Sequence, residues 1–330
     1  MLIRIITLSF CFVLSACSQN DKVKSDLDNL AERLESFTQI SVSAYDSDAS
    51  LNAPIKNSLA IDVPELQIAL REFYAIDDCP LSQFIAERNT ALGKTQLPST
   101  RFIYEQRLLS TLKSCMQQLP VDDPMQEQLQ GWIEQKQTNL PLVWSNMMTQ
   151  SDESYLAFTA SGGYISGASN DGLQPSKLAL VFLINVLNAQ TIDSGQLELH
   201  LRDLSNARLP AKMWRTQALL SESLPPMSQL LETYIQNNQN ACSSAKKEEL
   251  KIMRNIFTLF FADNIQPLAS QLNHYQYQLN PSFETLANHP HIPTDWADYI
   301  KRQYLNSAQQ YKQTMQQHIE LWQQVFKLCE

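Results

Sequence analysis

The sequence predicts a mainly α-helical, bundle-like body with a small β element near residues 155–202. Two observations favour helices. The 330-residue chain contains only 7 glycines, and apolar residues recur at spacings of three and four over long stretches. One region departs from this pattern: residues 159–172 hold four of the glycines and sit among aromatic and β-branched residues. We therefore expect helices on both sides of one irregular region.

The chain begins with the pattern of an export signal. Arg4 precedes an apolar run of about a dozen residues, which is too short to cross a bilayer as a mature helix. The run ends in the tetrapeptide LSAC, residues 14–17, which resembles the lipobox of bacterial lipoproteins. That resemblance implies a signal peptide at residues 1–16 and acyl chains, palmitate among them, on Cys17. The alternative is a plain cleaved signal with an incidental cysteine.

The lipobox also sets the expected organisation and location of the chain. Residues 17–25 form a polar, lipidated tether, and residues 26–330 form a single, mainly helical periplasmic domain. Ser18, rather than Asp, follows Cys17, which by analogy with enterobacterial lipoproteins directs the protein to the outer membrane, facing the periplasm. The net charge of −9 argues against nucleic acid as a partner. We expect a monomer held to the membrane by lipid, with envelope proteins or peptidoglycan as candidate partners.

The first helices follow from spacing and from proline. An amphipathic helix is predicted by residues at spacings of three and four, namely Val23, Leu27, Leu30, Leu34 and Phe37. A loop rich in Ser, Asp and Asn comes next. Pro64 is typical of a first helical turn and predicts another helix through residue 76.

A helix pair and four cysteines follow. Residues 80–94 and 98–119 predict two antiparallel helices joined by a short turn. Cys11 leaves with the signal and Cys17 is lipidated, so Cys79, Cys115, Cys242 and Cys329 remain. In an oxidising compartment they form two disulfides, with three possible pairings. The helix pair favours Cys79 with Cys115, which leaves Cys242 with Cys329.

The middle of the chain mixes two patterns. Asp122 and Asp123 precede a proline and predict a helix start, with the helix running towards Trp132 and Trp144. Residues 154–166 are rich in aromatic and β-branched residues, and residues 195–204 alternate between apolar and polar side chains. Residues 176–188, between them, predict a buried helix. The two flanking segments predict the small β element.

The last segment has the clearest helical pattern of the chain. Its apolar stripe consists of Tyr304, Ala308, Tyr311, Met315, His318, Trp322, Val325 and Cys329. These spacings of four and three indicate a long helix packed along a bundle. An aromatic stripe with this spacing is typical of a core rather than of a ligand site.

The sequence contains no complete catalytic or cofactor motif. In the glycine stretch, Leu173 and Gln174 stand where a phosphate-binding loop needs Lys and Ser or Thr. His289 and His291 form only a weak metal pattern, because zinc needs three or four converging ligands. We expect no cofactor and no metal, and we interpret the glycine stretch as a connection or as the rim of a pocket.

One helix pair carries an unusual density of polar groups: Glu87, Arg88, Asn89, Arg101 and Glu105. The favoured interpretation is a buried salt-bridge network, and the alternative is the lining of a groove. With the lipobox, the pattern AERN, Leu-Gly, Pro-Ser-x-Arg and Tyr-Glu between residues 86 and 105 resembles an uncharacterised family of proteobacterial lipoproteins, a domain of unknown function. The resemblance implies an envelope location and a helical body, and it assigns no catalytic residue.

These observations favour binding or scaffolding in the cell envelope over catalysis. The alternative is an envelope hydrolase that acts on peptidoglycan or glycans through two facing carboxylates. Candidate carboxylate pairs are residues 77–78, 122–123 and 248–249. The first two pairs flank prolines at expected helix starts, where acidic side chains stabilise the helix dipole.

Overall fold

The computed structural model describes residues 22–45, 50–68, 79–90, 93, 95–160, 163–167, 171–239 and 242–329. Within these ranges the chain is mainly helical and contains no strand. Residues 1–21, which include the predicted signal peptide and Cys17, lie outside the described residues. None of the helices in the described part is long and apolar enough to cross a membrane.

The helical segments of each type lie in the following order along the chain. The α-helices are α1 (Lys22–Thr38), α3 (Leu81–Asn89), α5 (Pro98–Gln118), α6 (Met125–Gln150), α7 (Asp152–Thr159), α8 (Leu173–Asn185), α9 (Ser194–Ala207), α10 (Leu209–Asn238), α11 (Ser244–Ile256), α12 (Ile265–Ala287), α13 (Thr294–Lys301) and α14 (Ala308–Phe326). Short 3₁₀ segments are η2 (Lys56–Leu59) and η3 (Val186–Asn188), and π-helical segments are η4 (Phe257–Ala262) and η5 (Arg302–Ser307).

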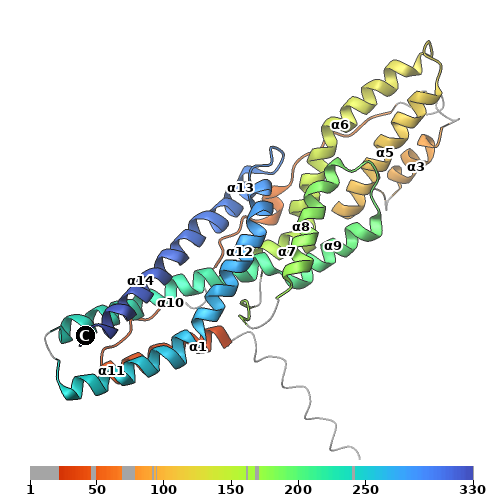
Figure 1. Cartoon of the computed structure of the whole chain (residues 1–330). Helices are drawn as coiled ribbons and strands as arrows, with labels where there is room; N and C mark the ends of the chain where they lie inside the picture. Colours follow the sequence, from red (N-terminus) through yellow and green to blue (C-terminus); the bar gives the residue numbers. More distant parts are fainter. Residues whose placement is uncertain are drawn as a thin grey trace, which may run out of the picture.

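The helices form an elongated body with two distinct ends (Figure 1). At the hairpin end, α5 and α6 pack against each other and α3 packs on α5. At the bundle end, α10 packs along α14, and α1 and α11 lie beside them. The helices α7, α8, α9, α12 and α13 occupy the part between the two ends.

The first and last predicted helices are confirmed. In α1, Val23, Leu27, Leu30 and Leu34 are buried. The stripe predicted for the last helix runs through η5 and α14, and its buried members are Tyr304, Ala308, Tyr311, Met315, His318, Trp322 and Val325. Spacing alone therefore identified the core-facing sides of both helices.

The predicted β element is wrong for the described residues. The alternating segment 195–204 lies in α9, where Leu197, Leu201 and Leu204 are buried at helical spacing and Leu199 is 41% exposed. Asp193 starts the helix, because its side chain accepts a hydrogen bond from the main-chain N–H of Gln196 at 3.1 Å. Leu197 and Leu201 fit both a helical stripe and a two-residue alternation, so the pattern alone is ambiguous. The Asp193 cap favours the helix.

The glycine stretch forms a connection that is packed into the core. Ile165 is fully buried, and its N–H donates to Thr216 Oγ1 at 3.1 Å. Asp171 Oδ2 accepts hydrogen bonds from the Ser166 N–H at 3.0 Å and from the Tyr275 hydroxyl at 3.1 Å. These hydrogen bonds join the described part of the loop to α10 and α12.

Two glycines in this stretch have a structural requirement. Gly167 and Gly172 adopt φ values of +68° and +85°, which disfavour residues with a side chain. A Cβ at Gly167 would lie 3.2 Å from the Cα of Leu268, and one at Gly172 would lie 2.6 Å from the Cβ of Ala207. These glycines bring the loop close to α9 and α12. Residues 161–162 and 168–170 lie outside the described residues.

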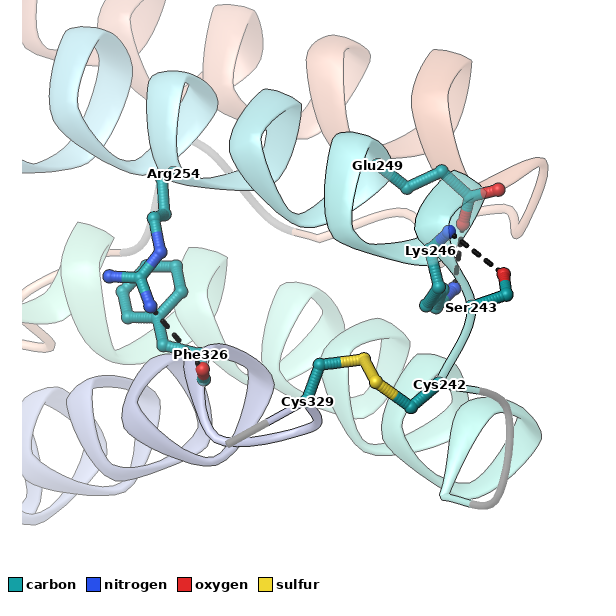
Figure 2. Close-up of a disulfide and its surroundings, with 7 residues drawn as sticks. All are labelled: Cys242, Ser243, Lys246, Glu249, Arg254, Phe326 and Cys329. Atoms are coloured by element: carbon teal, nitrogen blue, oxygen red, sulfur yellow. Dashed lines mark hydrogen bonds and ion pairs between the residues drawn. A yellow bond between two sulfur atoms is a disulfide. The ribbon is translucent and has the colours of Figure 1, made fainter.

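One disulfide lies at each end of the molecule. At the hairpin end, Cys79 bonds to Cys115, with Cα atoms 5.9 Å apart, as the predicted helix pair implies. At the bundle end, Cys242 bonds to Cys329, with Cα atoms 5.5 Å apart. Figure 2 shows this second disulfide joining the turn before α11 to the chain just after α14. Each bond therefore fixes a helix terminus to a neighbouring helix.

The helix predicted to start at Pro64 is wrong for the described residues. Residues 50–68 form a mostly extended segment that we call the strap, whereas residues 69–78 lie outside the described part. Asn146 of α6 bonds to both main-chain polar atoms of Ile61, each at 2.8 Å. Asn139 donates to the Pro64 carbonyl at 2.8 Å, and Gln150 donates to the Lys56 carbonyl at 2.8 Å. These amides replace the hydrogen bonds that a helix would supply.

Candidate functional site

Two cavities lie side by side at the hairpin end, between α3, α5, α6 and the strap. Their volumes are about 570 Å³ and about 310 Å³. Glu65, Arg88 and Arg101 line both of them, so we describe them together as the cleft. A combined space of this size is in the range of small-molecule and peptide sites.

A buried ion pair forms one wall of the cleft. Lys136 of α6 and Glu105 of α5 are 5% and 3% exposed, and their charged atoms lie 2.8 Å apart. Arg101, one helical turn before Glu105, makes a second ion pair with the same carboxylate. Burying charges is costly unless they are paired. The two cations therefore pair with the carboxylate of Glu105 where α5 packs against α6.

Arg101 has one terminal guanidinium nitrogen without a hydrogen-bond partner among the described residues. Its Nη2 contacts Glu105, and its guanidinium lies over the ring of Tyr104 at 5.6 Å from the ring centre. Its Nη1 is buried and has no hydrogen-bond partner among the described residues. An unpaired buried donor on an ionised group is unfavourable by about 1–3 kcal/mol or more. Such a donor marks a position where a ligand acceptor would be stabilised.

Arg88 forms the second cation of the cleft. Its Nη2 lies 3.4 Å from the exposed carboxylate of Glu65, and its Nη1 donates to the carbonyl of Gly93. A side chain at position 93 would collide with the carbonyl of Glu87. Glycine therefore permits the close turn after α3 that places the Gly93 carbonyl against Arg88.

Tyr104 is held neutral and fixed in place. Its hydroxyl donates to the Phe84 carbonyl at 2.9 Å, which ties α5 to α3. Burial, reinforced by the nearby carboxylate of Glu105, raises the pKa of Tyr104 above its ordinary value. The phenol therefore acts as a hydrogen-bond donor and a flat surface rather than as a base or nucleophile.

The structure brings together three of the five polar residues predicted for this helix pair. Arg88, Arg101 and Glu105 line the cleft, whereas Glu87 is exposed outside it. The side chain of Asn89 lies outside the described residues. The ion pair between Arg101 and Glu105 is partly buried and also lines the cleft.

Lys136 was missed by sequence reasoning, although a signal was present. It sits in a glutamine-rich stretch that looks solvated. However, it falls on the same helical stripe as Trp132, Ile133, Leu140 and Val143, all of which are buried. A lysine on an apolar stripe predicts a buried partner of opposite charge. The partner itself, on another helix, is set by tertiary packing.

Three of the other candidate carboxylates make local contacts at or within helices. Asp123 Oδ1 accepts from the Met125 N–H at 2.8 Å and caps α6. Glu248 and Glu249 pair with lysines of their own helix, each at 2.7 Å. Asp77 and Asp78 lie outside the described residues.

The histidines pack against aromatic rings. His289 lies 4.3 Å from the Trp144 ring, centre to centre. Burial, with a smaller contribution from His291, lowers the pKa of His289. Within the described ranges, no three metal-ligating side chains gather at one point.

A second buried polar group lies at the bundle end. His318 is fully buried, its Nδ1 lies 2.9 Å from Ser228 Oγ, and its Nε2 accepts from the Trp322 indole N–H at 3.0 Å. The indole is only a donor, so Nε2 carries no proton and Nδ1–H donates to Ser228. Burial lowers the pKa of His318 to about 3. This histidine is a neutral structural link between α10 and α14.

Comparison with known proteins gives a family without an assigned activity. No curated protein and no solved structure matches the chain. A family model described as "Protein of unknown function (DUF3080)" matches residues 27–330. The match includes both ends of the molecule and every residue that lines the cleft. The chain therefore belongs to this family of proteins of unknown function.

Proposed function

We propose that the protein is a monomeric lipoprotein of the cell envelope that binds a ligand in the cleft at its hairpin end. Residues 1–16 act as the signal peptide, Cys17 carries the lipid, and residues 17–25 tether one helical domain to the outer membrane, facing the periplasm. The LSAC tetrapeptide supports the anchor. The two disulfides support an oxidising compartment, where such bonds persist.

The observation that carries the binding function is the pair of adjoining cavities bordered by the same two arginines. Arg88 and Arg101 come from different helices, and the strap contributes Glu65. The Lys136–Glu105 pair fixes the wall between α5 and α6. A preformed concave site with a few convergent polar groups is typical of ligand binding.

The carboxylates of the cleft do not favour hydrolysis. Glycoside hydrolysis needs one protonated and one ionised carboxyl group facing a substrate. Glu105 is held by two cations, and Glu65 is 75% exposed and paired with Arg88. Each carboxylate is therefore engaged by a cation of the cleft rather than left facing a substrate position. Binding without catalysis therefore fits the cleft better.

The anchor is tested by changing the lipidation site. The Cys17→Ala variant should move from the membrane fraction to the soluble periplasmic fraction, because one acylated residue supplies the attachment. Unchanged sedimentation with outer membranes would contradict the lipid anchor.

The binding site is tested by photo-crosslinking in intact cells. A photoreactive phenylalanine at Leu66, which lines the larger cavity, should give a specific adduct. The matched control places it at Tyr277 of α12, which is 78% exposed and distant in the chain from the cleft. Absence of an adduct at position 66, or the same adduct at both positions, would contradict binding in the cleft.

A further inference from the structure

We propose that the cleft recognises the C-terminal end of an aliphatic acyl amino acid or peptide: a carboxylate, the neighbouring amide N–H and an apolar side chain. This inference rests on the proposed binding function and names its ligand class. Three features of the cleft carry it, one for each chemical group.

The arginines supply the carboxylate position. Arg101 Nη1 is buried without a hydrogen-bond partner among the described residues, while Nη2 is taken by Glu105. Arg88 borders the same two cavities. A guanidinium binds a carboxylate by short, charge-assisted hydrogen bonds of fixed direction. A ligand carboxylate at this point would satisfy the donor that the fold leaves unpaired.

Gln96 supplies a position for an amide N–H. Its side-chain oxygen is buried and has no hydrogen-bond partner in the described part of the chain. Gln96 lines the smaller cavity together with Arg101. An unpaired acceptor and an unpaired donor on residues that line the same cavity are complementary to a group that carries a carboxylate next to an N–H. The end of a peptide has that arrangement.

The larger cavity supplies the apolar position. Leu66, Ile68, Ile85 and Leu108 line it together with the ring of Tyr104. A volume of about 570 Å³ accommodates an aliphatic side chain and a short stretch of main chain. Burial of that side chain provides affinity, while the polar groups fix its orientation.

The net charge of the cleft is opposite in sign to the net charge of the whole chain. The whole chain carries a net charge of −9. The cleft is lined by three cations, Arg88, Arg101 and Lys136, and by two carboxylates, Glu65 and Glu105. The cleft thus has one more cation than carboxylates, so binding of an anion there should weaken as salt rises.

The test uses calorimetry on the full lipidated chain in phospholipid nanodiscs. The probes are N-acetyl-leucine, N-acetyl-leucinamide, which lacks the carboxylate, and 4-methylpentanoate, which lacks the amide. N-acetyl-leucine should bind at least about tenfold more tightly than either of the others. Equal affinity for the acid and the amide would overturn the proposal.

Two variants assign the groups. Arg101→Lys keeps a cation beside Glu105 but removes Nη1, and it should abolish the preference for the acid. Gln96→Leu should abolish the preference for N-acetyl-leucine over 4-methylpentanoate. The control is Arg107→Lys, an exposed position on the same helix. An unchanged thermal midpoint verifies folding, and a folded Arg101→Lys variant that retains the preference would overturn the proposal.

Two further measurements distinguish a peptide terminus from a free acyl amino acid, and distinguish failure of the ligand class from failure of the binding function. The peptide Ala-Ala-Leu binding more tightly than N-acetyl-leucine indicates a chain terminus, and equal binding indicates a free acyl amino acid; both support the ligand class. A specific adduct at position 66 without any preference for the acid would overturn the ligand class and leave the binding function standing. If neither is observed, both fall.

Discussion

The hairpin end buries an ion pair between two helices, whereas the bundle end buries a neutral histidine between two helices. At the hairpin end, Lys136 and Glu105 form an ion pair beside a cleft. At the bundle end, His318 is neutral and has both ring nitrogens hydrogen-bonded. Rings of Phe261 and Trp322 lie 5.0 Å and 6.3 Å from the imidazole, centre to centre.

Hydrogen bonding distinguishes the structural polar group at the bundle end from the candidate binding groups at the hairpin end. His318 leaves no ring nitrogen unpaired, and its surroundings exclude the charged form. At the hairpin end, a donor of Arg101 and an acceptor of Gln96 have no hydrogen-bond partner among the described residues. Buried polar groups that are fully satisfied stabilise a fold, whereas unsatisfied ones next to a cavity indicate a ligand. Four perturbations test this contrast.

The largest expected effect comes from the disulfides. The Cys242–Cys329 bond closes a separation of 87 residues and the Cys79–Cys115 bond one of 36. Loop-closure entropy predicts losses of about 5 and about 4 kcal/mol on replacing each pair by serine. Urea unfolding of the two double variants measures both losses. A larger loss at the hairpin end would show that the bonds act through folded-state contacts rather than through loop length.

The next largest effect is expected at the buried ion pair. Lys136→Met leaves Glu105 with Arg101 alone and should lower the free energy of unfolding by about 3 kcal/mol. The control is Lys251→Met, which breaks an exposed pair with Glu248 and should cost less than about 0.5 kcal/mol. Adding Glu105→Gln to Lys136→Met should restore part of the loss. Equal effects of the two lysine variants would show that the buried pair is not stabilising.

These residues show what the sequence predicts and where it stops. The stripes of α1 and α14 identified buried faces because helical spacing is a local property. The α3–α5 pair and its disulfide followed from two prolines, a short turn and cysteine positions. Lys136 lay on a visible stripe, but its partner depended on how α6 packs against α5.

The strap and α9 show the opposite case. Pro64 is typical of a first helical turn, yet Asn139 and Asn146 of α6 bind the main chain of Pro64 and Ile61 in a non-helical segment. In α9, alternation suggested a strand, and the Asp193 cap with the stripe of three buried leucines produced a helix. In the strap, hydrogen bonds to residues distant in the chain outweighed the local sequence signal. In α9, a local cap outweighed a short alternating pattern. The cleft depends on the strap, so its full outline was not predictable.

A third, smaller effect is expected from pH. The pKa of His318 is about 3 in the folded protein and about 6.5 when unfolded. Between these values the unfolded state binds the extra proton, so stability is complete above pH 6.5 and falls as pH decreases towards 3. From pH 7 to pH 5 the loss due to this group should be about 2 kcal/mol. Urea unfolding at both pH values measures it.

The matched variants for this effect are His318→Gln and His274→Gln. The first removes the titration and should flatten the pH dependence by most of that amount. The second changes an exposed histidine and should leave the pH dependence as it is. Hydrogen exchange at pH 5 should increase first in α10 and α14. If exchange increased first in α5 and α6, the hairpin end rather than the bundle end would be the acid-sensitive part of the molecule.

The smallest effect is expected where the strap meets the hairpin end. Asn146→Ala removes two hydrogen bonds to the half-buried main chain of Ile61 and should cost about 1 kcal/mol of global stability. Its local effect should be larger than its global one, because the amide of Ile61 loses its acceptor and should exchange much faster. The control is Asn288→Ala, whose side chain bonds only within its own helix end. Since Ile61 also lines the smaller cavity, Asn146→Ala should weaken ligand binding while α10 and α14 keep their protection. Unchanged exchange at Ile61 would show that the strap holds its position without the asparagine, and the contrast between the two ends would then rest on the ionised groups alone.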